Sequence, residues 1–447
     1  MPSDAWKVLQ NGSDIRGVAL PGVVDEPVDL TEPVARAIGQ AFTLWLARRK
    51  AKSPSELRIS VGHDSRLSAD ALQDALSEGI VRQGAQVCLF GLASTPGMFM
   101  STVTDGWRFD GAVMITASHL PFNRNGFKFF VAEGGLEKVD ITAILDLAED
   151  PPHGVPCAPG KVSSADFMSV YAEGLVEAIR KGAADREHPG QPLKGLKIIV
   201  DAGNGAGGFF VDKVLAPLGA DTAGSQFLEP DGTFPNHAPN PENADAMDAI
   251  VRAVVTTGAD LGIIFDTDVD RAGAVDKSGK EINRNRLIAL LAAILLEEHS
   301  GTTIVTDSIT SDELAAFIES LGGIHHRFKR GYRNVINEAI RLNSEGIDAQ
   351  LAMETSGHGA LKENYFLDDG AYLMAKILIK VAQLHRAGRS IDSLLETLSE
   401  PLEAHEIRLK VNARDFRPIG EAVLAAVRTR AESDPGWIVA PRNHEGI

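Results

Sequence analysis

The stretch Leu196–Asp201, LKIIVD, sets the pattern from which the fold of this chain can be predicted. It is a β-branched apolar run that ends in an aspartate and turn-forming residues, as is typical of a buried strand followed by a loop. The same pattern occurs in Leu57–Asp64 and in Thr303–Asp307. Helix-like patterns follow the three runs, at Ala69–Gln83, Gly208–Leu218 and Asp312–Leu321. Because strands alternate with helices, we expect α/β units in which helices cover the sheets.

The three runs are separated by domain-sized intervals, which indicates three similar α/β units rather than a short-period repeat. The Pro/Gly-rich segment Asp150–Gly160 is predicted to be a linker. A polar stretch at Ser399–Glu406 precedes a predicted strand at Ile407–Val411 and a predicted helix near Glu421–Glu432. These last elements would open a fourth unit, which appears shortened because few residues remain for it.

The composition is that of a globular protein, with 44% apolar and 23% charged residues among 447. Lys and Arg number 44 and Asp and Glu number 61, so the formal net charge is −17. A polyanion requires a basic footprint, so this balance argues against nucleic acid and anionic membranes as partners. It does not exclude a small anionic ligand held by a few local cations.

Two cysteines, Cys88 and Cys157, cannot form a disulfide framework, and the N-terminus shows no secretory signal. We therefore expect a cytoplasmic protein. The longest apolar run, Leu287–Leu296, is about half of a membrane span and predicts a buried core helix.

Three alternating aspartates, Asp266, Asp268 and Asp270, follow the predicted strand Leu261–Phe265. Carboxylates at this spacing beyond the end of a strand can converge on one point. They would repel one another there, so a hard divalent cation is the natural compensation, and Mg²⁺ suits the oxygen ligands. Arg271, next in the chain, could hold a phosphate group at the same place. The alternative interpretation is a solvated acidic turn in which one aspartate caps a helix.

Two further loops carry groups with catalytic chemistry. Thr116–Lys128 follows the predicted strand Gly111–Ile115 and presents Ser118 among small residues, although an ordinary serine turn is the alternative. Met353–Gly359 offers a glutamate, a serine and a histidine that could bind a sugar diol and carry a proton. An ordinary solvated loop is the alternative there.

The remaining motifs are less specific. Arg327–Arg333 has four cations in seven residues, a pattern that a solvated basic face also gives. Ser13–Gly17 places Arg16 before a glycine in a turn. We interpret Asp64–Arg66 and Asp201–Gly205 as turn and capping chemistry rather than as catalytic.

Taken together, four loops resemble the active-site loops of the α-D-phosphohexomutase family, the phosphoglucomutases and phosphomannomutases. They are D-I-R-G, T-A-S-H-x-P with a lysine ten residues after the serine, D-x-D-x-D-R and E-x-S-G-H, in the family's order. The resemblance runs from about Asp14 to at least Asp369. It implies three similar α/β domains with mixed sheets around a central cleft, followed by a C-terminal α+β domain that appears truncated here. The corresponding domain boundaries are 1–160 (phosphoserine loop), 161–298 (metal site), 299–400 (sugar binding) and 401–447 (an incomplete phosphate-binding domain).

The resemblance also implies a role for each matching residue. Ser118 would carry a phosphoryl group and complete a Mg²⁺ site with Asp266, Asp268 and Asp270. Lys128, Arg16 and His358 would be catalytic, with His358 as a candidate acid or base. The substrate-binding residues implied are His119, Arg271, Lys329, Gly331, Tyr332, Glu354 and Ser356.

The implied substrate is a phosphorylated hexose, and a hexose 1,6-bisphosphate would be the intermediate and activator. The motifs do not separate mannose, glucose and amino sugars, and nothing in the sequence predicts an oligomeric state. Leu120 stands where most of the family has Asn, which is expected to shift the serine loop without removing the nucleophile. Nothing after Ile407 resembles the family's phosphate-binding loop, so the sequence does not predict whether the chain completes the full mutase reaction.

Two alternatives are a haloacid dehalogenase-type phosphatase with Asp266 as nucleophile and a sugar-phosphate-binding protein without turnover. The first leaves the Ser118 loop unexplained, and its motif usually lies near the N-terminus of its fold. A Walker-type kinase is disfavoured because no P-loop motif is present.

Overall fold

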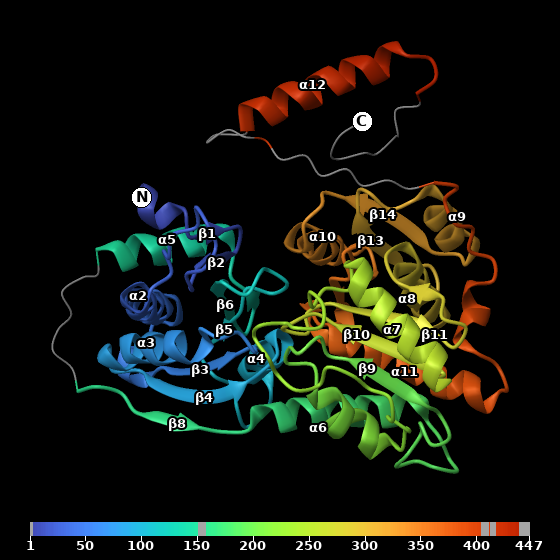
Figure 1. Cartoon of the computed structure of the whole chain (residues 1–447), viewed down its shortest axis with the longest axis horizontal. Coiled ribbons are helices and arrows are strands. Elements are labelled where there is room, and N and C mark those ends of the chain that lie inside the picture. The colour runs from blue at the N-terminus through green and yellow to red at the C-terminus, as the bar shows by residue number, and fades with distance from the viewer. Residues whose placement is uncertain (1–2, 151–157, 404–410, 412–416, 438–447) are drawn as a thin grey trace. The chain divides into compact units, whose positions relative to one another are not determined.

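The computed structural model describes residues 3–150, 158–403, 411 and 417–437. The chain divides into two compact units, Met1–Asn283 with Leu367–Ile391, and Arg284–Phe366 with Asp392–Ile447. Figure 1 shows the elements of both along the chain. The predicted linker at 150–160 and the predicted strand at 407–411 lie mostly outside the described residues.

The larger sheet of the first unit is mixed and has eight strands. Its order is β1-β2-β6-β5-β3-β4-β8, and β7 pairs with β6. Strand β3 is parallel to β4 and β5, whereas β6 is antiparallel to β5 and β2. The strands are β1 (Gln10–Asn11), β2 (Asp14–Val18), β3 (Arg58–His63), β4 (Gln86–Leu92), β5 (Gly111–Ile115), β6 (Arg124–Val131), β7 (Gly134–Gly135) and β8 (Val162–Ser164).

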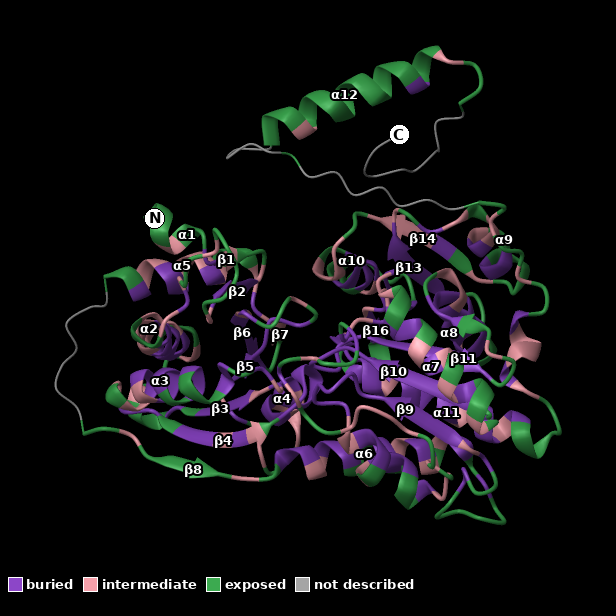
Figure 2. Ribbon diagram, in the orientation of Figure 1, coloured by how far each residue is buried: buried purple, intermediate pink, exposed green. Residues whose placement is uncertain are grey.

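Helices cover both faces of this sheet. Successive side chains of a strand point to opposite faces, so each face of a buried strand needs its own packing partner. Ile59 and Val61 of β3 belong to the apolar core beneath α2 (Glu32–Lys50), α3 (Ala69–Arg82) and α5 (Lys138–Glu149). Between them, Ser60 faces the other way and forms a 2.8 Å hydrogen bond with Ser101 of α4 (Thr95–Val103). Figure 2 shows the central strands as buried and the outer helix faces as exposed. A short helix α1 (Asp4–Lys7) precedes the sheet.

The second sheet of the first unit has the order β12-β11-β10-β9. Its strands are β9 (Ile198–Asp201), β10 (Leu261–Phe265), β11 (Ala272–Asp276) and β12 (Glu281–Ile282). Strands β9 and β10 are parallel, and β10 and β11 are antiparallel. The helix α7 (Ala244–Thr257) packs its apolar face on this sheet, and α6 (Phe167–Ala183) packs against α11 (Gly370–Arg386).

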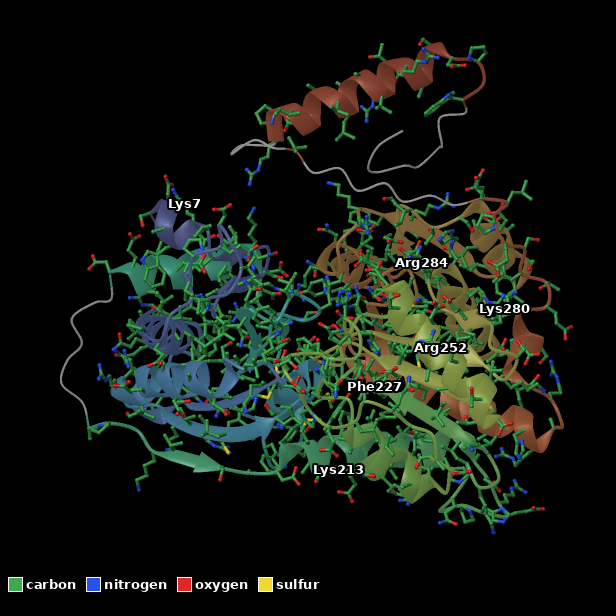
Figure 3. The ribbon with its side chains drawn as sticks, viewed as in Figure 1. Lys7, Lys213, Phe227, Arg252, Lys280 and Arg284 are labelled. Atoms are coloured by element: carbon green, nitrogen blue, oxygen red, sulfur yellow. The ribbon has the colours of Figure 1, made fainter. Side chains whose placement is uncertain are left out.

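The helix predicted at Gly208–Leu218 is present, although its two segments are not α-helical. It is a π-helix, Phe210–Leu215, followed by a 3₁₀ turn, Ala216–Leu218. Pro217 lacks an N–H group, so the α-helical hydrogen-bond pattern cannot continue through it. Lys213, labelled in Figure 3, ties the π-helix to α6, with its Nζ 2.6 Å from Ser169 Oγ.

The second unit contains the strands β14-β13-β15-β16 in that order. They are β13 (Thr303–Asp307), β14 (Ile324–Phe328), β15 (Ala349–Met353) and β16 (Gly359–Leu361). Strand β13 is parallel to β14 and β15, and β15 is antiparallel to β16, so this sheet is mixed as well. The main helices are α8 (Asn285–Glu298), α9 (Asp312–Ser320) and α10 (Tyr332–Ser344).

Two helix predictions are confirmed in the second unit. The apolar run Leu287–Leu296 is buried throughout within α8. The helix expected near 421–432 is α12 (Arg417–Ser433). Among the described residues, no helix combines the length and the apolar character that crossing a bilayer would require.

Candidate active site

Three buried carboxylates lie at the carboxyl end of β10, in the first unit. Asp266, Asp268 and Asp270 are at most 1% exposed, and one oxygen of each lies within 4.8 Å of the others. Burial, together with the neighbouring Asp270 and Asp268 carboxylates, raises the pKa of Asp266 well above its usual value. Asp268 Oδ1 is buried and has no hydrogen-bond partner in the described structure. A cluster of hard oxygen donors with one unused oxygen fits a divalent cation such as Mg²⁺.

The turn that holds these carboxylates has a strained backbone, and a hydrogen bond from the start of α11 supports it. Val269 has φ +67°, which is unfavourable for a β-branched residue. Its carbonyl oxygen accepts a 3.1 Å hydrogen bond from the N–H of Gly370, at the start of α11. A Cβ atom at Gly370 would lie 2.7 Å from the carbonyl carbon of Arg271, so glycine permits this close approach. Helix α11 therefore helps to hold the aspartates together.

Two buried cations compensate the negative charge. Lys128, from β6, forms ion pairs with Asp270 and, at 3.3 Å, with Asp268. Arg271 donates from Nε and Nη2 to Asp266 Oδ2, at 3.1 and 3.0 Å. A buried carboxylate cluster without such partners would carry a large desolvation penalty. The cations therefore make the cluster possible and also place positive charge where a phosphate group could bind.

Ser118 lies directly against this cluster. Its Oγ donates a 2.9 Å hydrogen bond to Asp266 Oδ2 and accepts one of 2.9 Å from Arg271 Nη2. The residue has φ +50°, an uncommon conformation for a residue other than glycine. Its backbone N–H donates to Thr116 Oγ1 at 2.8 Å. The hydroxyl is thus fixed between a carboxylate and a guanidinium group.

Two more of the residues predicted from the sequence lie in the same part of the first unit. The ring nitrogen Nδ1 of His119 lies 2.6 Å from Arg271 Nη2. Arg16, from β2, donates to the carbonyl oxygen of Ala117 at 3.0 Å and to Asp14 Oδ2 at 3.0 Å. The structure therefore brings Ser118, Lys128 and Arg271 against the three aspartates, from segments far apart in the sequence. His119 contacts Arg271, and Arg16 contacts the serine loop.

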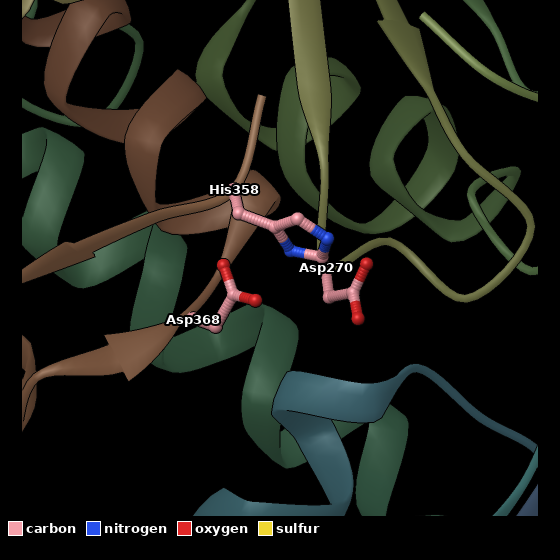
Figure 4. A group of neighbouring side chains, drawn as sticks. All are labelled: Asp270, His358 and Asp368. Atoms are coloured by element: carbon pink, nitrogen blue, oxygen red, sulfur yellow. The ribbon is translucent and has the colours of Figure 1, made fainter. Parts of the chain in front are cut away.

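Sequence reasoning missed several residues that shape this group. Thr95 donates from Oγ1 to Asp268 Oδ2 at 2.5 Å, and Asn240 Oδ1 accepts from Arg271 Nη1 at 3.3 Å. Asp368, of β17 (Leu367–Asp368), has a carboxylate oxygen within 4.8 Å of one of Asp270, as Figure 4 illustrates. The only sequence signal for Asp368 was its position just before a helix, which looks like a cap. Neither Thr95 nor Asn240 belongs to a motif that stands out by itself.

The second unit holds the other predicted residues. Glu354, just after β15, is buried, and its Oε1 accepts a 2.6 Å hydrogen bond from the N–H of Gly331. Ser356 Oγ lies 3.5 Å from Glu354 Oε2. The ring of Tyr332 stacks on that of His358 with centroids 5.1 Å apart. Lys329 is exposed in the loop between β14 and α10. The segments 329–332 and 354–358 therefore form one group of side chains.

Asp307 is a further carboxylate in this group that the sequence analysis assigned only to the end of a strand. It is fully buried and accepts a 2.9 Å hydrogen bond from Thr355 Oγ1. Burial, together with the charge of Glu354, raises the pKa of Asp307 to about 6. Asp307 is the last residue of β13 and Glu354 directly follows β15, and because these strands are adjacent and parallel the two carboxylates are neighbours.

Comparisons with known protein families agree with this arrangement. Successive parts of the chain match domains I, II and III of "Phosphoglucomutase/phosphomannomutase, alpha/beta/alpha", over residues 7–150, 171–279 and 283–402. A phosphomannomutase/phosphoglucomutase of Pseudomonas putida is 30% identical over 397 residues, 88% of this chain and 81% of that protein. The chain belongs to the phosphoglucomutase/phosphomannomutase family. The predicted family and the predicted fold class, three α/β domains with mixed sheets, are thereby confirmed.

Other members of the phosphoglucomutase/phosphomannomutase family show the same extent of similarity. A phosphoglucomutase of Neisseria gonorrhoeae is 30% identical over 389 residues, 87% of this chain and 78% of that protein. The crystal structure of a phosphoglucomutase/phosphomannomutase family protein of Burkholderia thailandensis is 28% identical, with a TM-score of 0.76. The similarity covers 97% of this chain and 86% of that one. Matches along so much of the chain do not favour the haloacid dehalogenase alternative.

Proposed function

We propose that this chain is a phosphohexomutase, an isomerase that interconverts the 1- and 6-phosphates of glucose or mannose with Ser118 as the phosphoryl carrier. The observation that carries this proposal is the position of Ser118 Oγ, 2.9 Å from both Asp266 Oδ2 and Arg271 Nη2. The relatives named phosphomannomutase/phosphoglucomutase support the reaction class. We also propose the domain boundaries 160, 298 and 400 from the sequence, whereas the match to the family's domain III begins earlier, at residue 283.

Phosphoryl transfer depends mostly on positioning and on the neutralisation of charge on the phosphate oxygens. In the forward half-reaction, a hexose hydroxyl oxygen attacks phosphorus, the bond from phosphorus to Ser118 Oγ breaks, and a hexose bisphosphate forms. The hydroxyl proton passes to the His358 imidazole, and the Ser118 oxygen, released as an alkoxide, takes up one proton from solvent. In the second half-reaction, Ser118 Oγ attacks the other phosphate of the bisphosphate, which restores the phosphoserine and releases the isomer.

The first-unit cations have defined parts in these steps. Arg271 already donates to Ser118 Oγ, so it can stabilise the negative charge that develops on that atom when the bond to phosphorus breaks. Arg16 lies beside the serine loop, His119 belongs to that loop, and both would contact the phosphate oxygens. Lys128 is buried and keeps its charge close to the reacting group.

The carboxylate cluster fits Mg²⁺, as the unused oxygen of Asp268 indicates. Asp266, Asp268 and Asp270 would hold the ion, with the phosphoserine as a fourth ligand. When bound, the ion would supply Lewis-acid stabilisation of phosphate oxygens. We assign the sugar hydroxyl groups to Glu354 and Ser356, and substrate contacts to Lys329, Gly331 and Tyr332.

The test is an assay of 1- and 6-phosphohexose interconversion with a trace of hexose 1,6-bisphosphate, in wild type and in Ser118→Ala. We expect Ser118→Ala to lower kcat by at least about 10³-fold, because the carrier is removed. Mass spectrometry of the wild-type peptide that contains Ser118 should detect a phosphoryl group. Ser163→Ala, on the exposed strand β8, is the matched control and should retain full activity.

Unchanged turnover in Ser118→Ala would exclude a phosphoserine route. Free phosphate is measured in the same assay, because release that is abolished by Asp266→Ala and retained by Ser118→Ala would indicate a phosphatase instead. Tight sugar-phosphate binding without either activity would indicate a binding protein.

A further inference from the structure

Arg66, in the turn after β3, lies buried at the centre of the loop that presents Ser118. The side chain is 2% exposed. Its guanidinium group donates to four backbone carbonyl groups of the segment 118–124. These are Ser118 at 2.6 Å, Leu120 at 2.5 Å, Pro121 at 2.8 Å and Arg124 at 2.9 Å. Inward-facing carbonyl groups need donors, and one planar group with several N–H bonds meets that need here.

A second chain of hydrogen bonds joins the same turn to the backbone of Ser118. Asp64 Oδ1 accepts from the N–H of Arg66 at 2.9 Å, and its Oδ2 accepts from Thr116 Oγ1 at 2.6 Å. Thr116 Oγ1 in turn accepts from the N–H of Ser118 at 2.8 Å. Both the N–H and the C=O of Ser118 are therefore fixed from the Asp64–Arg66 turn. This contact explains how Ser118 keeps its φ of +50°.

The other side of Arg66 contacts the segment 229–243, which follows β9 in the chain. The guanidinium carbon lies 5.3 Å from the centroid of the Phe234 ring. Gly232 lies so close that a Cβ atom there would be 2.8 Å from Arg66 Cα. The same segment supplies Asn240, which binds Arg271, and Arg271 binds Ser118 Oγ. The two arginines thus hold Ser118 at its backbone and at its hydroxyl, and one segment contacts both.

We propose that Arg66 is a positioning residue for phosphoryl transfer, which sets the place of Ser118 Oγ by holding the four carbonyl groups of 118–124. This inference rests on the proposed role of Ser118. Arg66 itself does not touch the phosphate in this assignment. Transfer requires the reacting atoms in line, and a displacement of about 1 Å can lower the rate by about 10²-fold. Lysine has three donors on one nitrogen and cannot span four carbonyl groups, so Arg66→Lys keeps the charge and loses the geometry.

The test compares Arg66→Lys with wild type in two measurements. The first is kcat and KM for hexose phosphate, where we expect kcat to fall by about 10²-fold with KM little changed. The second is hydrogen–deuterium exchange of peptides that cover 116–124, where we expect faster exchange. Arg36→Lys is the matched control, because it makes the same change in a half-exposed ion pair with Glu78. It should alter neither measurement.

Thr116→Val is the second variant, in case Arg66→Lys does not fold. It is nearly isosteric and removes only the hydroxyl between Asp64 and the N–H of Ser118, so we expect about 10-fold lower kcat and locally faster exchange. Wild-type exchange and wild-type kcat in a folded Arg66→Lys would overturn the inference. If the wild-type protein shows no turnover, the proposed function is contradicted. The hydrogen–deuterium exchange of 116–124 in Arg66→Lys and wild type would still test whether Arg66 holds this loop.

Discussion

At the scale of the residue, Asp307 shows how burial and a neighbouring charge act on one carboxylate. Its pKa is raised to about 6, from a usual value near 4, by burial and by Glu354, while Thr355 and Arg330 act in the opposite direction. Below pH 4 the carboxyl group is neutral in both the folded and the unfolded chain, so its burial costs the folded state no ionisation energy and the stability is fully present. Between pH 4 and 6 the unfolded chain ionises first, and this stability is lost.

We therefore predict that Asp307→Asn raises the free energy of unfolding of the second unit above pH 6, by up to about 3 kcal/mol. The asparagine oxygen can still accept from Thr355, so the loop contact survives. Urea unfolding curves at pH 4, 5, 6 and 8 check this, and the difference from wild type should vanish toward pH 4. Asp348→Asn is the control, because its exposed carboxylate pairs with Lys362 and has a lowered pKa. A stabilising effect in both variants would contradict the assignment to burial.

At the scale of the element, the packing of α2 on α3 depends on two glycines. A Cβ atom at Gly39 would lie 2.2 Å from the carbonyl oxygen of Leu76, and one at Gly79 would lie 2.1 Å from that of Arg36. Because backbone atoms cannot move aside as a flexible side chain can, we predict that Gly39→Ala destabilises the first unit by about 1–3 kcal/mol. Thermal unfolding followed by circular dichroism measures the change.

The matched control is Gly174→Ala in α6, where the added Cβ would meet no atom within 4 Å outside its own stretch of helix. That variant should gain about 0.5–1 kcal/mol, because alanine favours the helix. Equal losses in both variants would mean that helix contact is not the cause.

The same scale shows what could be predicted from the sequence. Strands β5 and β10 have the predicted bounds, Gly111–Ile115 and Leu261–Phe265, because a buried strand is marked by its own apolar run. The helix predicted at 208–218 is present as a π-helix followed by a 3₁₀ turn, and the apolar pattern did not specify these helix types. The role of Arg66 was not predictable, because its partners are carbonyl groups more than fifty residues away. Every residue type has a backbone carbonyl group, so the sequence does not show which carbonyl groups accept these hydrogen bonds.

At the scale of the whole molecule, the net charge of −17 has two different origins. Most acidic groups in the described residues are solvated, but Asp266, Asp268 and Asp270 are buried together and form ion pairs with Lys128 and Arg271. Like charges in a buried place repel strongly, because the medium screens them little. We therefore expect the folded chain to gain stability from a cation bound at this cluster, in contrast to a diffuse surface charge.

We predict that Mg²⁺ raises the unfolding temperature of the first unit, since an ion bound only by the folded state stabilises it by mass action. At 100 times the dissociation constant the gain is about 2.7 kcal/mol, which EDTA should reverse. Differential scanning calorimetry across a Mg²⁺ titration measures the shift. Asp268→Asn should abolish it, because Asp268 contributes the buried oxygen without a partner, and Asp105→Asn, in an exposed turn, should leave it intact. Lys128→Met should enlarge the shift, because it removes a cation that now competes for Asp268 and Asp270. An equal shift in Asp268→Asn and wild type would mean that Mg²⁺ acts elsewhere on the acidic surface.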